Sequence, residues 1–197
     1  MSATADPSSL AQAAAPATLQ IRLDRAEQMF NTLDPYPFIE RDLDPAAEDY
    51  LVSWAQDLPK NQPIRIEVLI PKTEAAIPHA RQLPEAVHAY FTNRAAAVHR
   101  ELKQLFRIGR TALFIGIVML GSCLLLAQTV TSFFPDSRFA SVLGEGFIIA
   151  GWVANWRPIE IFLYDWWPLV RRRALFQRLA QAKLEVIAEP ASRPQPV

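Results

Sequence analysis

The chain has 197 residues, in which 20 Lys and Arg balance 20 Asp and Glu to a formal net charge of zero. A single cysteine excludes an internal disulfide, and six glycines are too few to favour the Gly-rich loops that cradle phosphates. The balanced charge gives no sign of a nucleic-acid partner, so we expect none.

The two ends of the chain lack the pattern of a folded segment. Residues 1–17 are rich in Ala, Ser and Pro and lack the basic and apolar regions of a signal peptide. Residues 189–197 are rich in proline. We expect both segments to be disordered.

Residues 18–72 predict a small cytoplasmic α/β domain. Apolar residues alternate with polar ones from Leu19 to Leu23, which is the pattern of a half-buried strand. Asp24 and Glu27 follow with the spacing of a capping box, so we expect a helix to begin there.

The same domain continues with a second helix and a second strand. Asp44 and Pro45 supply the N-cap and the first residue of the helix. Residues 64–70 alternate most clearly of all and predict the strand. Because a two-stranded sheet in so small a unit is marginal, we infer that residues 183–188, which also alternate, pair with it as a third strand.

Residues 73–110 predict a linker and a basic amphipathic helix that continues into the next segment. An apolar seam recurs every three or four residues along it, for fewer than three heptads. Two alternatives stay open, since the seam can pack on the domain or pair with a second copy of the chain. The seam consists of Phe91, Ala95, Val98, Leu102, Leu105 and Gly109.

Two apolar segments predict a membrane hairpin. The first, residues 111–134, carries no charge. Counted together with Pro135 it has about 25 residues, which would extend roughly 37 Å as a helix. The hydrocarbon core of a bilayer is about 30 Å thick. The second, residues 139–157, carries only two charged side chains, Glu145 and the terminal Arg157. The short link between the segments requires the two helices to be antiparallel.

Lys and Arg near the ends of the spans predict the orientation, with both termini cytoplasmic and the link outside. The link holds only Arg138, which Asp136 offsets. We also expect the basic collar to attract anionic lipid headgroups. The collar consists of Arg94, Arg100, Lys103, Arg107 and Arg110 before the first span, and of Arg171, Arg172, Arg173, Arg178 and Lys183 after the second.

Residues 158–170 are dense in aromatic side chains. Pro158 permits a bend, and Trp and Tyr favour the level of the headgroups, so we expect this segment to lie in the cytoplasmic interface. Phe162 is expected among the side chains that face lipid. The segment is either a functional site at the membrane surface or an anchor that sets the depth of the helices. Residues 171–188 then predict a basic helix and the third strand.

Six polar residues in or at the membrane are candidates for function. Glu145 is the single acid within the spans, a candidate for proton or ion passage, although its neighbours Gly144 and Gly146 could instead let the helices approach closely. Arg157 and Glu160 have the i, i+3 spacing of an ion pair. The full set is Glu145, Asn155, Arg157, Glu160, Tyr164 and Asp165.

We predict no catalytic, cofactor-binding or metal-binding site. The chain has no G-x-S-x-G, P-loop, G-x-G-x-x-G or CxxC motif. The acidic pair Asp42 and Asp44 has the spacing of a short metal-binding motif, but helix capping and a solvated loop explain it.

Three segments carry a resemblance to known proteins: D-P-Y-P-F at 34–38, R-D-L-D-P at 41–45 and F-L-Y-D-W-W-P-L at 162–169. Together with the two spans they resemble small uncharacterised two-pass inner-membrane proteins of bacteria, over most of residues 18–188. The resemblance implies residence in the bacterial inner membrane and carries no activity.

The expected fold is therefore a membrane α-helical hairpin with a small cytoplasmic α/β domain of the order β-α-α-β, completed by a third strand from the C-terminus. The leading hypothesis is a non-enzymatic two-pass protein that acts as an oligomeric scaffold or as an accessory subunit of a membrane complex, through self-association or a membrane protein partner. One alternative is a transport or proton- or ion-conducting component that uses Glu145 with Arg157 and Glu160. A membrane-bound enzyme is the third.

Overall fold

The computed structural model describes residues 16–59 and 62–189, and the chain divides into two compact units. Unit 1 comprises Met1–Ala96 and Arg173–Val197, and unit 2 comprises Ala97–Arg172. The predictions of disorder for 1–17 and 189–197 lie outside the described residues except at their inner ends, where they are wrong, because Ala17 begins β1 and Glu189 ends β3. In chain order the elements are β1 (Ala17–Arg22), η2 (Ala26–Met29), η3 (Phe38–Glu40), α1 (Pro45–Gln56), β2 (Ile64–Pro71), α2 (Lys72–Ala75), α3 (Pro78–Phe133), α4 (Arg138–Ala154), α5 (Trp156–Glu160), η4 (Ile161–Asp165), α6 (Trp166–Ala180) and β3 (Lys183–Glu189).

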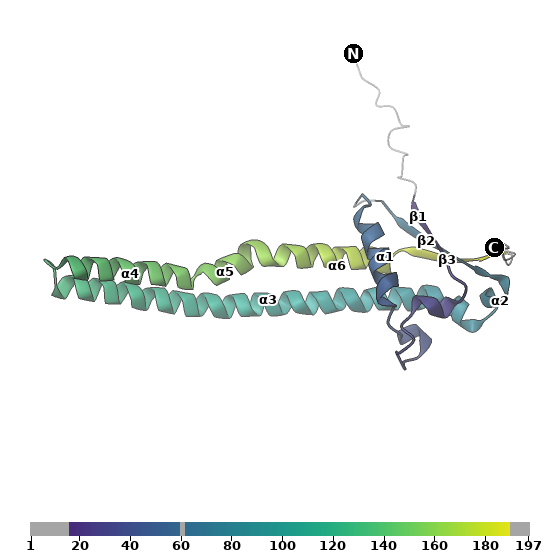
Figure 1. The fold of residues 1–197 in the computed structure, drawn as a ribbon, viewed down its shortest axis with the longest axis horizontal. Helices are drawn as coiled ribbons and strands as arrows, with labels where there is room; N and C mark the ends of the chain where they lie inside the picture. The colour runs from purple at the N-terminus through teal and green to yellow at the C-terminus, as the bar shows by residue number, and fades with distance from the viewer. Residues whose placement is uncertain (1–15, 60–61, 190–197) are drawn as a thin grey trace, which may run out of the picture. The chain divides into compact units, whose positions relative to one another are not determined.

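A three-stranded parallel sheet in the order β1-β2-β3 forms the centre of unit 1 (Figure 1). Ile66 of β2 lies opposite Leu19 of β1 on one side and Leu184 of β3 on the other. The predicted pairing of the C-terminal strand with residues 64–70 is thus confirmed.

The sheet is covered on one face. In β2 the residues of one face, from Ile64 to Ile70, are buried, whereas those between them are half-buried. Both connections lead in the same direction across the sheet, so right-handed crossovers place their helices on the same side. Polar contacts occupy the other face, among them the 2.7 Å ion pair between Arg22 and Glu189.

The segment after β1 differs from the predicted helix. Ala26–Met29 form a single 3₁₀ turn, and Gln28 rather than Glu27 closes it. The Gln28 Oε1 atom accepts a hydrogen bond from the Asp24 backbone N–H at 3.0 Å. An amide side chain serves this purpose as well as a carboxylate does, and the capping-box pattern alone does not determine how far a helix continues.

The predicted start of α1 is confirmed. Asp44 Oδ1 accepts a hydrogen bond from the Ala46 N–H at 2.9 Å, and Pro45 is the first helical residue. This cap satisfies one of the free N–H groups at the helix start. Leu51 and Ala55, one turn apart on α1, are fully buried in the core of unit 1.

Helix α3 contains both the amphipathic helix and the first apolar segment without a break, as predicted. The seam packs within the chain. In unit 1 the ring of Phe91 lies 6.1 Å from that of Phe176, and in unit 2 Gly109 lies against Ile161. Phe91 and Gly109 are therefore buried within the chain, whereas Leu102 and Leu105 of the seam are half-buried.

In unit 2, α3 and α4 lie side by side and antiparallel (Figure 1). Of the described helices, α3 alone is long and apolar enough to cross a membrane by length and composition, and 17% of its apolar window is buried. A core helix of a soluble protein would instead be mostly buried.

Candidate functional site

Glycines set the contact between α3 and α4. A Cβ added at Gly151 would lie 2.8 Å from Leu120 Cδ1 and 3.2 Å from Leu120 Cα, so the backbones approach closely there. A Cβ added at Gly144 would lie 3.1 Å from Thr131 Cγ2, also closer than ordinary contact, whereas a Cβ added at Gly146 would meet nothing within 4 Å. The predicted role in helix approach therefore holds for Gly144 and is wrong for Gly146.

Asn155 joins the two helices where α4 ends. The side chain is 7% exposed, and its Nδ2 donates to the Gly116 carbonyl of α3 and to the Gly151 carbonyl of α4, each at 3.0 Å. The Asn155 backbone N–H donates instead to Trp152, at 3.0 Å, so the side chain takes the acceptor that the helix leaves free. This candidate is a helix-to-helix clamp, and its donors are fully used.

Arg157, Glu160 and Asp165 form one polar cluster. Arg157 Nη1 lies 3.2 Å from Glu160 Oε2 and 3.1 Å from Asp165 Oδ2. The indole N–H of Trp156 donates to Glu160 Oε1 at 2.9 Å. The predicted i, i+3 pair is present, and because these side chains are substantially exposed, each ion pair contributes at most about 1 kcal/mol.

A π-helical turn, η4, brings Asp165 to Arg157, and the sequence analysis missed this contact. Pro168 cannot donate a backbone hydrogen bond, and its ring excludes the carbonyl four residues earlier, so a widened turn just before it relieves the conflict. The Trp166 indole N–H donates to the Phe162 carbonyl at 3.0 Å, which satisfies an acceptor in the distorted turn.

The segment at 158–170 packs along α3. Ile161 is fully buried beside Gly109, and the ring of Phe162 lies 6.2 Å from that of Phe106. Phe162 was expected to face lipid, but it is half-buried between helices, because Gly109 lets α3 approach it closely.

The structure does not bring Glu145 to the other candidates. Its side chain is exposed, and no described residue forms a hydrogen bond or ion pair with it. Twelve residues of helix, about 18 Å, separate it from Arg157. Tyr164 is also exposed, at 69%. The six candidates therefore form one clamp, one cluster and two isolated side chains.

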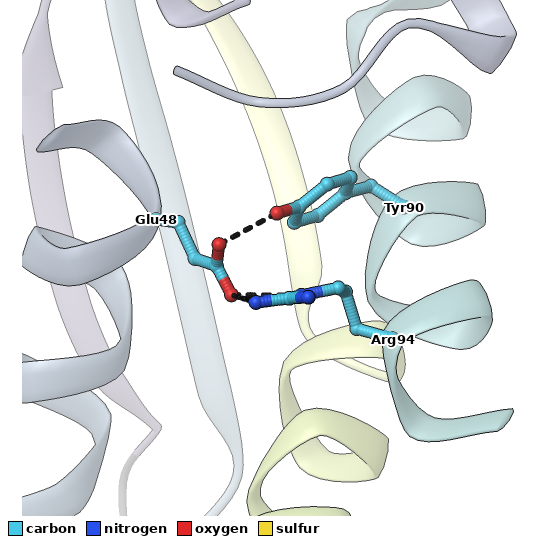
Figure 2. Close-up of polar contacts among 3 residues, drawn as sticks. All are labelled: Glu48, Tyr90 and Arg94. Atoms are coloured by element: carbon cyan, nitrogen blue, oxygen red, sulfur yellow. Dashed lines mark hydrogen bonds and ion pairs between the residues drawn. The ribbon is translucent and has the colours of Figure 1, made fainter. Parts of the chain in front are cut away.

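A second polar cluster, in unit 1, was missed by the sequence analysis. Glu48 of α1 accepts hydrogen bonds from Tyr90 Oη at 2.7 Å and from Arg94 Nε and Nη2 at 3.0 and 2.8 Å (Figure 2). The Arg94 guanidinium also lies over the ring of Phe176, 5.6 Å from its centroid. Arg94 was assigned to the basic collar, but Glu48 neutralises it, so it is not a free cation.

This cluster binds α1 to α3. The Glu48 side chain is 16% exposed and that of Arg94 is 39% exposed, so water screens the pair only in part. Removing one partner of a buried pair costs about 3–5 kcal/mol, and the exposure of Arg94 reduces this to about 1–3 kcal/mol. The groups bond to one another, which indicates a structural role.

The Tyr90 hydroxyl supplies a test of this cluster. Burial first, then the hydrogen bond to Glu48 and its negative charge, raise the pKa of Tyr90 well above its ordinary value. Glu48→Gln should lower that pKa, while burial keeps part of the shift. The absorbance of the phenolate, compared with a Tyr90→Phe variant, measures the change. Asp49→Asn, at the next residue of α1, is the control and should leave the titration of Tyr90 unaltered.

The raised pKa of Tyr90 also determines how the stability of the fold changes at alkaline pH. Folding raises the pKa of Tyr90, so the unfolded chain loses this proton at a lower pH than the folded chain. The contribution to stability is present below the ordinary tyrosine pKa and is lost as pH rises towards the folded value. Glu48→Gln should lower the pKa of Tyr90 in the folded chain, so the variant should lose less stability than the wild type as pH rises.

Among residues 16–59 and 62–189, no group of three His, Cys, Asp or Glu side chains is placed to hold a metal ion. Asp44 caps α1. Asp34 accepts hydrogen bonds from the backbone N–H of Asp42 and then of Tyr36, and these bonds lower the pKa of Asp34. Comparisons with protein-family models, curated proteins and solved structures give no match.

Proposed function

We propose that this chain is a non-enzymatic two-pass protein of the bacterial inner membrane. In this proposal α3 and α4 anchor a small cytoplasmic α/β unit, and the protein serves as an oligomeric scaffold or as an accessory subunit of a membrane complex. The argument starts from the sheet, because its topology constrains how the chain can meet a bilayer.

The observation that carries the proposal is the parallel pairing of β2 with β3. All of α3 lies between these strands in the chain. Adjacent strands occupy one side of any membrane, so a chain that crosses through α3 has to cross back before Lys183. The number of crossings is therefore even, and α4 is the apolar helix that follows.

The surface of α4 supports its role as the second span. Its 17 residues extend about 25 Å, and α5 follows after Asn155. A bilayer is the solvent in which such a surface is stable, since a soluble protein rarely exposes a large contiguous apolar patch. The large exposed apolar side chains of this helix are Phe139, Val142, Leu143, Ile148, Ile149, Trp152 and Val153.

The charges support a cytoplasmic position for both termini. Exposed cations precede the apolar run of α3 and follow α5, whereas the link carries one base and one acid. The same cations favour anionic headgroups at the cytoplasmic face, at about 1 kcal/mol for each residue near the surface.

A scaffold or accessory role accords with the polar clusters. Asn155 clamps α3 to α4, and Glu48 clamps α1 to α3 through Tyr90 and Arg94. Chemistry requires a nucleophile, a base or a charged site left free to meet a substrate. These groups are instead engaged with each other.

The transport alternative gains less support. Glu145 is exposed, and about 18 Å of helix separates it from Arg157. One hairpin therefore does not join these groups in a common path, and conduction would need several copies of the chain.

A reporter experiment tests the two-pass topology. A periplasm-active reporter fused after Val197 should give no signal, while the same reporter inserted after Asp136, before the Ser137 cap of α4, should be active. A cytoplasm-active reporter at the same two positions is the control and should show the opposite pattern. Activity of the periplasmic reporter at Val197 would contradict both the topology and the pairing argument.

A further inference from the structure

Four cations of α3 occupy one face of the helix. At about 100° per residue they fall within roughly 80° of arc. Gly109, which contacts Ile161, lies about 140° from the middle of that arc, so the face points away from the partner helix. We call this face the basic ridge; it consists of Arg100, Lys103, Arg107 and Arg110, all exposed.

The basic ridge has no counter-charge in the described part of the chain. Glu101, the one acid on this stretch of α3, lies about 140° around the helix from the middle of the ridge. Glu160 and Asp165 pair with Arg157 instead. None of the four ridge side chains has an ion pair or hydrogen bond to a described residue. Like charges three and four residues apart destabilise a helix, so the basic ridge destabilises α3 in the isolated chain. A bound anion would remove this repulsion and stabilise the helix.

The height of the basic ridge indicates which anion it fits. From the start of the apolar run at Thr111, Arg110 and Arg107 lie about 1.5 and 6 Å along the helix, and Lys103 and Arg100 lie about 12 and 16 Å along it. The headgroup layer is about 5–7 Å deep on each side of the bilayer. Lipid phosphates therefore match the lower pair, and the upper pair extends past them.

We propose that the basic ridge docks an acidic helix of a partner membrane protein. The ridge rises in steps of about 4.5, 6 and 4.5 Å, which a neighbouring helix matches with Asp or Glu at three- and four-residue spacing. Such a helix reaches from the headgroup level to Arg100, which a lipid does not. This inference rests on the proposed role as an accessory subunit.

Lys103 makes the proposal directly testable in native membranes. A zero-length carbodiimide activates a carboxylate, the Lys103 Nζ attacks it, and an amide forms as the urea by-product leaves. A Lys103 cross-link to an Asp or Glu in a helical segment of another protein is the expected result. Lys103→Arg keeps the charge, so it should retain the complex and lose the cross-link. A complex that forms without a Lys103 cross-link would overturn the proposal.

Two double variants separate protein from lipid. Arg100→Gln with Lys103→Gln should reduce the co-purified partner by at least about tenfold while leaving membrane insertion intact. Arg107→Gln with Arg110→Gln is the matched pair at headgroup height. If the upper pair has no effect, and ridge binding follows only the phosphatidylglycerol content of vesicles and the lower pair, the ridge is a lipid site and the proposal fails. Absence of any partner protein would defeat the accessory-subunit role as well, whereas a complex independent of the upper pair defeats this inference alone.

Discussion

Replacing Gly151 with leucine is expected to separate α3 from α4 and to destabilise unit 2 strongly. An added Cβ would already lie 3.2 Å from the Cα of Leu120, which is backbone and cannot rotate away. Leucine adds three more carbons at this contact, so the helices have to move apart. Overpacking of this kind costs about 1–3 kcal/mol, and the loss of the Asn155 clamp adds about 1 kcal/mol.

Thermal unfolding in mild detergent, followed by tryptophan fluorescence, measures this effect. A loss of about 2–4 kcal/mol should lower Tm by roughly 4–16 °C for a chain of this size. Gly146→Leu is the matched control: the residue is on the same helix, but nothing lies within 4 Å of an added Cβ, so Tm should hardly change. Equal shifts for both variants would mean that α4 does not pack on α3 through Gly151.

The native cysteine offers an independent check on this packing. A Cβ at position 151 would lie 3.2 Å from the Cβ of Cys123, close to the separation of about 3.5–4.5 Å in disulfides. In the presence of an added thiol oxidant, Gly151→Cys should therefore form a disulfide with Cys123, detected by mass spectrometry, whereas Gly146→Cys should not.

Local patterns in the sequence predicted much of the fold. The uncharged run within α3, the Asp44 cap of α1 and the alternation in β2 are each properties of a short segment, so each was predicted correctly. The prediction of the third strand needed one further inference, namely that both ends of the hairpin emerge on the same side of the membrane. The structure confirms that pairing.

The polar clusters could be predicted only in part, because most of them depend on tertiary contacts. Glu48 and Arg94 are 46 residues apart and meet only once α1 packs on α3. Asp165 reaches Arg157 because a π-helical turn changes the angular spacing that an α-helix would give. The Arg157–Glu160 pair was predicted because both residues lie on one helical turn.

Truncation after Ala182 is expected to expose unit 1 to protease without preventing membrane insertion. Without β3, the sheet keeps only β1 and β2, and Val68, now 0% exposed, loses Val186 as its neighbour in the sheet. A two-stranded sheet is marginal, so we expect a loss of about 3 kcal/mol or more. Since cleavage tracks the population of open chains, that loss corresponds to a rate of proteolysis about 100-fold higher.

Two controls make the β3 experiment specific. Truncation after Glu189 leaves β3 complete and should keep the resistance to protease. In the full chain, Val186→Asp places a charge on the covered face of the sheet, whereas Ile187→Asp places it on the open face, because successive residues of a strand point to opposite sides. The first should raise the cleavage rate far more than the second. Equal rates for the two, or resistance after loss of β3, would show that β3 does not close the sheet, and the even number of membrane crossings would then lose its support.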